Sequence, residues 1–195
     1  MHHVSGRDPA AKRETMANPE HIALVKTGSE CWNQWRRDHP NIVPDLRVAH
    51  LRHARLCNMD LSGAILDIAI LHSADLSGAN LRGADLSSAN LERAVLCGAD
   101  LRGADLRGTK LTGGDLRRAD LSGVDLRSGV LYNADLEDAD LSGADLGSTL
   151  VYTAKNLTVE QLCSVGSLWL TELSERMSLA EQHCPHLLER PASTS

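Results

Sequence analysis

The sequence has no phenylalanine and only two tyrosines among its 195 residues, so aromatic rings cannot build its core. Long apolar runs are also missing, and no stretch approaches the roughly 18 residues that a membrane-spanning helix needs. The polar first residues, 1–17, lack the apolar block of a secretory signal. We therefore expect a cytoplasmic protein whose residues 1–17 form a disordered extension.

The cysteines are few and unpaired in sequence. None of the five is spaced as CxxC, and the odd number leaves one over, which favours reduced thiols over a disulfide framework. The thiols are those of Cys31, Cys57, Cys97, Cys163 and Cys184.

Neither the charge nor the motifs indicate an enzyme or a nucleic-acid-binding protein. The net charge of −6 gives no basic surface for direct contact with nucleic acid. No glycine-rich phosphate loop occurs in a βαβ context, and the carboxylates are spread along the chain instead of converging. The histidines lack a recognisable ligand spacing, so we expect surface or cap histidines, with adventitious metal binding as the alternative. Two groups motivate that alternative: His50, His53 and His72, and His183, Cys184 and His186. We expect no catalytic residue, cofactor or metal.

Leucine recurs at every fifth position from Leu46 to Leu146, twenty-one times without interruption. Five is not a period of a helix or a strand, so the chain must turn once in each unit. Fifteen units have Ala two residues before the Leu, fourteen have Asp or Asn one residue before it, and nine have Gly two residues after it. This pattern points Ala and Leu inward and puts Gly where a type II turn needs a positive φ.

Several units, including Ala84-Asp85-Leu86, Ala104-Asp105-Leu106 and Ala139-Asp140-Leu141, resemble the pentapeptide repeat family, whose pattern is close to A(D/N)LxG. The resemblance implies an all-β solenoid over residues 44–155, a right-handed quadrilateral β-helix with four units per coil. Twenty-one units then make about five coils, which stack to a height on the order of 25 Å. Cys57 and Cys97 would lie two coils apart, too far for a disulfide.

The flanking segments look like covers for the open ends of the solenoid. Residues 18–43 predict an N-terminal capping helix that carries Trp32 and Trp35, with a break at Gly28-Ser29; it is similar to the leading helix of many bacterial pentapeptide repeat proteins. Residues 156–195 predict a C-terminal helical cap and tail. Two capping-box spacings support it, Thr158 with Gln161 and Ser178 with Glu181. Binding of a partner to these helices is the alternative to simple capping.

Departures from the repeat mark candidate surfaces. Seven units lack Asp or Asn before the Leu, and they carry His50, Arg55, Ile65, Ile70, Val95, Lys110 and Val130 there. The outward positions Val130, Tyr132, Leu150 and Tyr152 form a candidate interface near the C-terminal end, and Ile65, Ile68 and Ile70 form a second apolar group near the start. The C-terminal helices of the chain, a second copy or another protein could cover the first patch.

Some members of the family, including quinolone-resistance proteins, are thought to imitate the acidic shape of DNA. For this chain the candidate acidic patch is Asp135, Glu137, Asp138, Asp140 and Asp145. Elsewhere Arg107 and Arg127 accompany Asp105 and Asp125, so the charge is mixed. A solvated charged flank is the alternative to a binding patch.

We thus expect a non-enzymatic scaffold for an unidentified protein partner, which could be a second copy, without membrane or direct nucleic-acid binding. The alternative is a DNA mimic that binds DNA gyrase or topoisomerase and protects against fluoroquinolones. Two features weaken this alternative: no loop interrupts Leu46 to Leu146, and Leu replaces the Phe of many such members.

Overall fold

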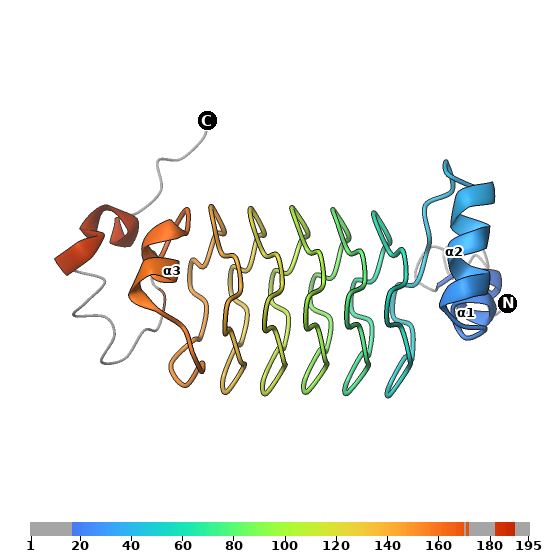
Figure 1. Ribbon diagram of the computed structural model, residues 1–195, viewed down its shortest axis with the longest axis horizontal. Helices are drawn as coiled ribbons and strands as arrows, with labels where there is room; N and C mark the ends of the chain where they lie inside the picture. The colour runs from blue at the N-terminus through green and yellow to red at the C-terminus, as the bar shows by residue number, and fades with distance from the viewer. Residues whose placement is uncertain (1–16, 170, 172–181, 190–195) are drawn as a thin grey trace, which may run out of the picture.

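The computed structural model describes residues 17–169, 171 and 182–189, and shows a row of similar coils between two helical ends (Figure 1). Helices α1 (Pro19–Val25) and α2 (Ser29–Asp38) lie at one end. At the other end are α3 (Val159–Ser164) and the 3₁₀ helix η2 (Pro185–Leu188). Residues 1–16 and the predicted capping box of Ser178 and Glu181 lie outside the described residues.

The coils are joined by isolated parallel β-bridges, and the described residues contain no extended strand. Nineteen bridges pair residues twenty apart, such as Asp45 with Ile65 and Val130 with Leu150. Four units of five residues therefore complete one turn of the winding. The expected all-β solenoid is therefore built from single bridges and not from strands. Each short unit gives two residues to its turn and leaves one bridge residue per side.

The bridge residues define four faces. Face A carries Asp45, Ile65, Asp85, Asp105, Asp125 and Asp145; face B carries His50, Ile70, Asn90, Lys110, Val130 and Leu150; face C carries Arg55, Asp75, Val95, Asp115, Asp135 and Lys155; and face D carries Asp60, Asn80, Asp100, Asp120 and Asp140.

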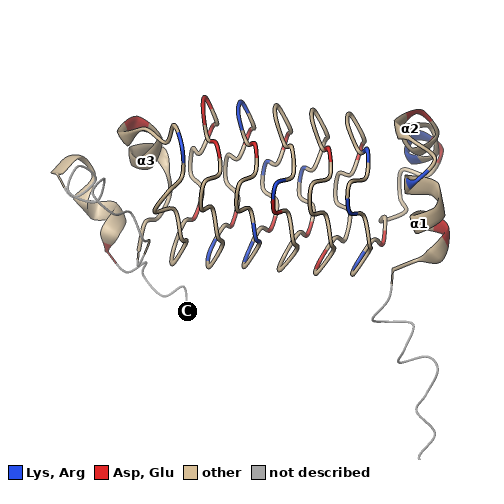
Figure 2. Ribbon diagram, turned by 90° about the horizontal axis from the view of Figure 1, so that it is seen from below, with Lys and Arg blue, Asp and Glu red and all other residues tan. Residues whose placement is uncertain are grey.

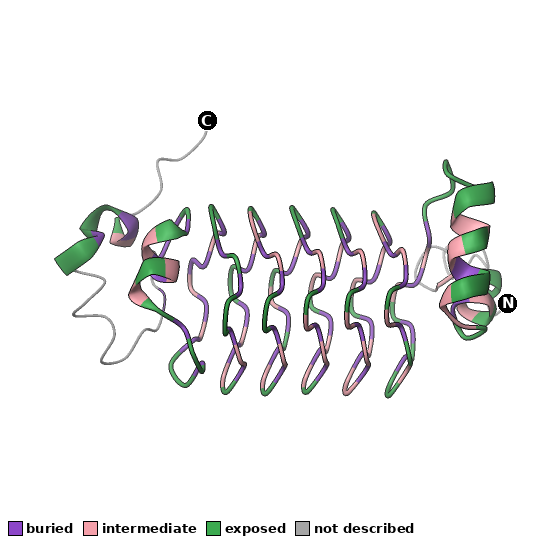
Figure 3. Cartoon of the chain, in the orientation of Figure 1, coloured by how far each residue is buried: buried purple, intermediate pink, exposed green. Residues whose placement is uncertain are grey.

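The repeated leucines fill the interior, as the spacing predicts. All twenty-one, from Leu46 to Leu146, have at most 2% of their surface exposed. In Figure 3 the buried positions recur along every coil. Met59, which replaces Ala in the first coil, is fully buried, and the carbonyls of its neighbours Asn58 and Asp60 accept hydrogen bonds from α2. The interior is therefore aliphatic and closed to solvent, which leaves the outward positions for recognition.

Every unit turns in the same way. The second residue after each repeated leucine has a positive φ, and only nine of these residues are glycine. The turn is closed by bonds such as that from the Ala49 N–H to the Leu46 carbonyl, at 3.1 Å. The predicted positive φ is thus confirmed, and it extends to units without glycine. In Val48 and Ile68 the left-handed residue is β-branched, which is an unfavourable choice.

The N-terminal helices replace the missing coil with side-chain hydrogen bonds. The indole N–H of the buried Trp32 donates to the Asp60 carbonyl at 2.8 Å, and the Asn33 carboxamide oxygen accepts from the Asp60 N–H at 2.8 Å. Arg36 donates to the Ser62 carbonyl at 2.9 Å. These contacts satisfy backbone groups that an open edge would expose. Gly28, with φ of 107°, separates α1 from α2 at the predicted break.

At the C-terminal end, α3 begins with the predicted capping box of Thr158 and Gln161. The Gln161 carboxamide also donates to the carbonyls of Leu136 and Ala139, at 2.9 and 2.8 Å. One side chain therefore caps both its own helix and the last coil.

A further unit, which the repeat spacing hides, follows α3. Ser167 bridges Asp145, and Leu168 is fully buried. The Thr171 N–H donates to the Leu168 carbonyl at 3.0 Å, as in the turns of the regular units. The bridge spans twenty-two residues instead of twenty because α3 takes the place of regular units. Because of this offset, Leu168 does not continue the five-residue spacing of the leucines, and the spacing does not predict the unit.

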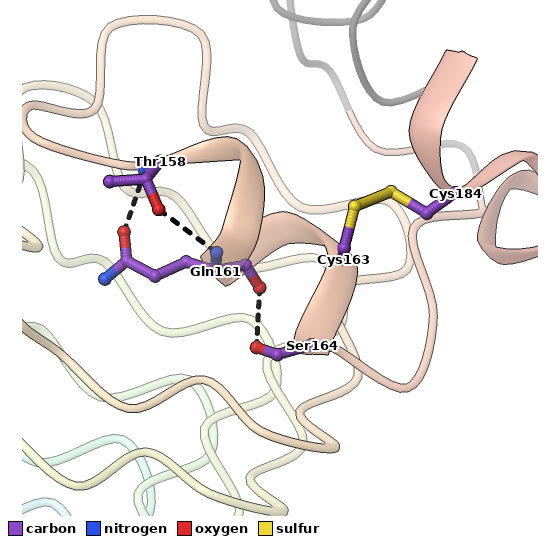
Figure 4. Close-up of a disulfide and its surroundings, with 5 residues drawn as sticks. All are labelled: Thr158, Gln161, Cys163, Ser164 and Cys184. Atoms are coloured by element: carbon purple, nitrogen blue, oxygen red, sulfur yellow. Dashed lines mark hydrogen bonds between the residues drawn. A yellow bond between two sulfur atoms is a disulfide. The ribbon is translucent and has the colours of Figure 1, made fainter.

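The expectation of reduced cysteines is wrong for one pair. Cys163 of α3 and Cys184, which precedes η2, form a disulfide with a Cα–Cα distance of 5.6 Å (Figure 4). They are separated by twenty-one residues, so their spacing in the sequence did not indicate the pair. Cys31, Cys57 and Cys97 are free, as expected.

Candidate interaction surface

The repeated carboxylates and carboxamides have a structural task. In all fourteen units that carry Asp or Asn before the leucine, its side-chain oxygen accepts from the backbone N–H two residues later. Asp105 and Arg107, with an N–O distance of 3.1 Å, are typical. This Asx-type hydrogen bond supports the turn. The first role of the acidic residues of the repeat is therefore to support the turns.

Arginines neutralise much of the acidic column of face A. The Arg107 guanidinium lies 2.5 Å from the Asp105 carboxylate and 3.7 Å from that of Asp125. Arg127 repeats the arrangement with Asp125 and, at 3.5 Å, with Asp145. The hydrogen bond from Arg107 lowers the pKa of Asp105 below its ordinary value. Basic and acidic positions accordingly lie close together along the coils in Figure 2.

The candidate acidic patch is divided among faces. Asp135 belongs to face C, and Glu137 and Asp138 occupy the corner that follows it; Asp140 lies on face D and Asp145 on face A. Asp135 also bridges Lys155 and accepts from Asn156 at 2.8 Å. The carboxylates thus turn around the rod and do not line one side of it.

The candidate interface lies together on one side. Val130 and Leu150 form a bridge on face B and are half-buried, and the tyrosines follow at the adjacent corner. Tyr152 is 55% exposed, whereas Tyr132 is half-buried. The described part of the C-terminal cap leaves Tyr152 open. The four predicted residues therefore form one apolar surface on adjacent coils.

Face B differs from the other faces along its whole length. Asn90 is its single turn-capping residue; the other five positions hold His50, Ile70, Lys110, Val130 and Leu150. At the opposite end from the tyrosines, Ile68 is 55% exposed at the corner next to Ile70. Sequence reasoning found Ile68 but missed Val48, which is 38% exposed in the same column. A valine at a turn position that is usually Gly, Asn or Ser was the sequence feature that could have identified it.

Nothing in the described residues resembles a reaction centre. No group of three or more His, Cys, Asp or Glu side chains there could hold a metal ion. A depression of about 740 Å³ lies beside α2, where Ser29, Cys31 and Trp35 help to line it. His21 is a cap residue: its Nδ1 accepts from the Asp45 N–H at 2.9 Å, and burial lowers its pKa. None of the helices in the described part of the chain is long and apolar enough to span a bilayer.

A rod wound from five-residue units, with an aliphatic interior and helical ends, defines a β-solenoid of the quadrilateral class. The chain belongs to the pentapeptide repeat family: the model for pentapeptide repeats matches eight copies, over residues 45–83, 74–113 and 119–149. Proteins of this family fold as right-handed β-helices, and they are in general structural or interaction proteins.

The chain is similar to solved pentapeptide repeat structures. One, from the Arabidopsis thaliana thylakoid lumen, is 31% identical, with 51% of this chain and 69% of that chain covered and a TM-score of 0.36. HetL of Nostoc sp. strain PCC 7120, involved in heterocyst differentiation regulation, is 33% identical, with coverages of 65% and 67% and a TM-score of 0.33. QnrB1, a plasmid-mediated fluoroquinolone resistance protein, is 17% identical, with coverages of 63% and 74% and a TM-score of 0.46. A comparison with curated proteins gives no match.

Proposed function

We propose that the protein is a non-enzymatic scaffold, a rod of about five coils closed by helices at both ends, that binds a protein partner through face B. The observation that carries the proposal is the loss of the turn-capping residue at five of the six bridge positions of this face. Each loss gives up a local hydrogen bond that the repeat uses elsewhere. Proteins depart from their local sequence preferences mainly at functional sites, so the missing turn caps mark face B as a binding surface.

The chemistry of face B suits protein recognition. Its C-terminal part offers Val130, Leu150 and the exposed ring of Tyr152, and tyrosine is enriched at the centres of interfaces. Lys110 and the hydrogen-bonding Asn90 lie between this patch and Ile70. An apolar surface interrupted by a few polar groups favours burial against another protein over exposure to water.

Binding to DNA gyrase or topoisomerase by DNA mimicry has less support. Mimicry needs carboxylates that remain unneutralised along one side, and on face A the arginines at 107 and 127 lie within ion-pair distance of the acidic column. Supercoiling by gyrase, measured with and without a fluoroquinolone, tests this alternative. Protection of gyrase by the full chain would favour it over the scaffold.

Amine-directed cross-linking in a cell extract tests the scaffold. Lys110 is the lysine of face B, Lys155 belongs to face C, and Lys26 follows α1. We expect cross-links to the partner through Lys110, and their loss on Val130→Asp. Ile65→Asp, the matched change on face A, should keep them. Cross-links confined to Lys155 or Lys26 would reject face B as the binding surface.

The sequence and the disulfide point to different locations for the protein. A cytoplasmic location stays a prediction from the sequence. The Cys163–Cys184 disulfide favours an oxidising compartment, since such bonds are rare where glutathione keeps thiols reduced. Trapping of free thiols in intact cells distinguishes the two, because a cytoplasmic protein should show all five thiols alkylated.

A further inference from the structure

The order of residues along face B is complementary to itself when it is reversed. We infer that the partner of face B is a second copy of this chain, bound antiparallel and face to face. The two-fold axis lies in the interface, perpendicular to both rods. The inference rests on the proposed function and names its partner. Face B has six rungs, so the axis passes between the third and the fourth.

Reversal sets one apolar side chain against another at the second and fifth positions of the face, and an imidazole against a leucine at its two ends. About this axis Ile70 of one copy opposes Val130 of the other, and His50 opposes Leu150. Ile70, Val130 and Leu150 are half-buried in the single chain, so their outer surfaces remain available. Each contact occurs twice, as the symmetry of an isologous interface requires. The side chains of Ile70 and Val130 thus cover each other.

Charges decide between antiparallel and parallel pairing. In the reversed arrangement the exposed Lys110 opposes Asn90 of the second copy. Glu92 follows Asn90 at the next corner of the same coil, so its carboxylate offers Lys110 an opposite charge. Glu92 lies 3.7 Å from His72 within its own chain, so it already points along this corner. A parallel pair would set Lys110 against Lys110. Like charges placed opposite each other in a sheet are destabilising.

The neighbouring corner column adds to the match. It carries Arg52, His72, Glu92, Thr112, Tyr132 and Tyr152 in order along the rod. Under the same axis Arg52 opposes Tyr152, and both side chains are exposed in the single chain. An arginine over an exposed tyrosine ring gains a cation–π contact. Arg52 and Tyr152 thereby gain a contact across the interface.

The described parts of both caps leave this face open. The side-chain hydrogen bonds from α2 to the coils go to Asn58, Asp60 and Ser62, at face D and the corners on either side of it. Gln161 of α3 bonds to Leu136 and Ala139, between faces C and D. Two rods can therefore approach along face B without displacing either set of contacts.

The test is the mass of the purified full chain by sedimentation, up to about 100 µM, where a weak interface is populated. We expect twice the mass of the 21.1 kDa chain. Ile70→Asp should raise the dissociation constant at least about tenfold. Ile65→Asp, the same substitution on face A of the same coil, should change it less than about twofold. Both variants install the residue that the repeat prefers there, so both should fold.

Cysteine cross-linking tests the orientation. In a chain with Cys31, Cys57 and Cys97 replaced by Ser, a mixture of Ile70→Cys and Val130→Cys proteins should form a covalent dimer, whereas Ile70→Cys alone should not. Rapid self-linking of Ile70→Cys would instead indicate a parallel pair and overturn the arrangement.

A charge exchange gives a second readout. Lys110→Glu and Glu92→Lys should each weaken the dimer, and the double variant should restore it. A monomer at all concentrations, or equal weakening by Ile65→Asp and Ile70→Asp, overturns the inference. A monomer that still cross-links a different protein through Lys110 in extract would leave the scaffold function intact, so the two failures are distinguishable.

Discussion

Leu168 donates its backbone N–H to the carbonyl oxygen of Leu187 at 2.7 Å. In a regular coil this donor would bond to the next turn of the solenoid, so Leu187 takes the place of a coil that does not follow. Cys184, three residues earlier, is buried and tied to Cys163 in α3. The last edge is thus closed by a segment that depends on a covalent bond.

Reduction of the disulfide should weaken the C-terminal cap. A bridge over a separation of twenty-one residues restricts the unfolded chain, and its loss should lower the free energy of unfolding by about 3 kcal/mol. Urea unfolding of wild type with and without reductant measures the change. Cys163→Ser should match reduced wild type, whereas Cys31→Ser should behave as wild type. Equal stability of the oxidised and reduced proteins would contradict the cap.

Trp32→Phe should destabilise the N-terminal cap by about 1 to 3 kcal/mol, because it removes a buried hydrogen bond to the Asp60 carbonyl and part of the buried ring. Thermal and denaturant unfolding measure the loss. Trp35, on the same helix, is only half-buried, so Trp35→Phe should cost less. A larger effect at Trp35 would place the anchor of the cap elsewhere.

Two aspartates should respond to substitution with opposite signs. The hydrogen bond from Arg107 lowers the pKa of Asp105, so its charge stabilises the fold above the ordinary pKa of about 3.9, and this gain is lost as the pH falls through the folded value. Partial burial, and then Asp85, raise the pKa of Asp67, so its charge costs stability above the folded pKa.

At neutral pH, Asp105→Asn should therefore lower the melting temperature, by the equivalent of about 0.5 to 1 kcal/mol, and Asp67→Asn should raise it. Both differences should shrink as the pH falls to about 4 and below. Asn can still accept the turn hydrogen bond at position 105, so the comparison isolates the charge. Melting curves across this range decide, and equal signs would contradict the assignment.

Ile68→Asn should stabilise the chain although it removes an aliphatic side chain. Ile68 has a φ of 58° and is 55% exposed, so its β-branched side chain strains the turn and buries little. Asparagine tolerates the left-handed region, and the gain should be about 1 kcal/mol by denaturant unfolding. Ser88→Asn, one coil further in the same column, is the control and should change little. A loss of stability would mean that Ile68 makes contacts that outweigh the strain.

The regular part of the fold could be predicted because each unit repeats one local solution. The position of Leu46 and its twenty successors determines which side chains are inside, and the turns follow from the spacing. The register of twenty came from the family resemblance, since local spacing does not say how many turns close a coil. The bridges of Asp45 with Ile65 and of its successors bear it out.

The irregular ends were less predictable because their contacts are not local. The pairing of Cys163 with Cys184 joins residues twenty-one positions apart, and the unit at Leu168 is out of phase by two residues. The cap over residues 18–43 is divided into α1 and α2 at Gly28, where the sequence placed the break. The candidate interface stands where the sequence placed it, yet its use by a partner stays a prediction, because recognition depends on a second molecule.

The four-unit coil also gives the chain a phase. An added or deleted unit would leave the interior filled, but it would rotate every later residue by a quarter turn. Val130 and Leu150 would then continue the column of Arg55 or of Asp45 instead of that of Ile70. Length changes by whole coils preserve the alignment, so growth and shrinkage of such a protein should proceed in steps of twenty residues wherever one side has a task.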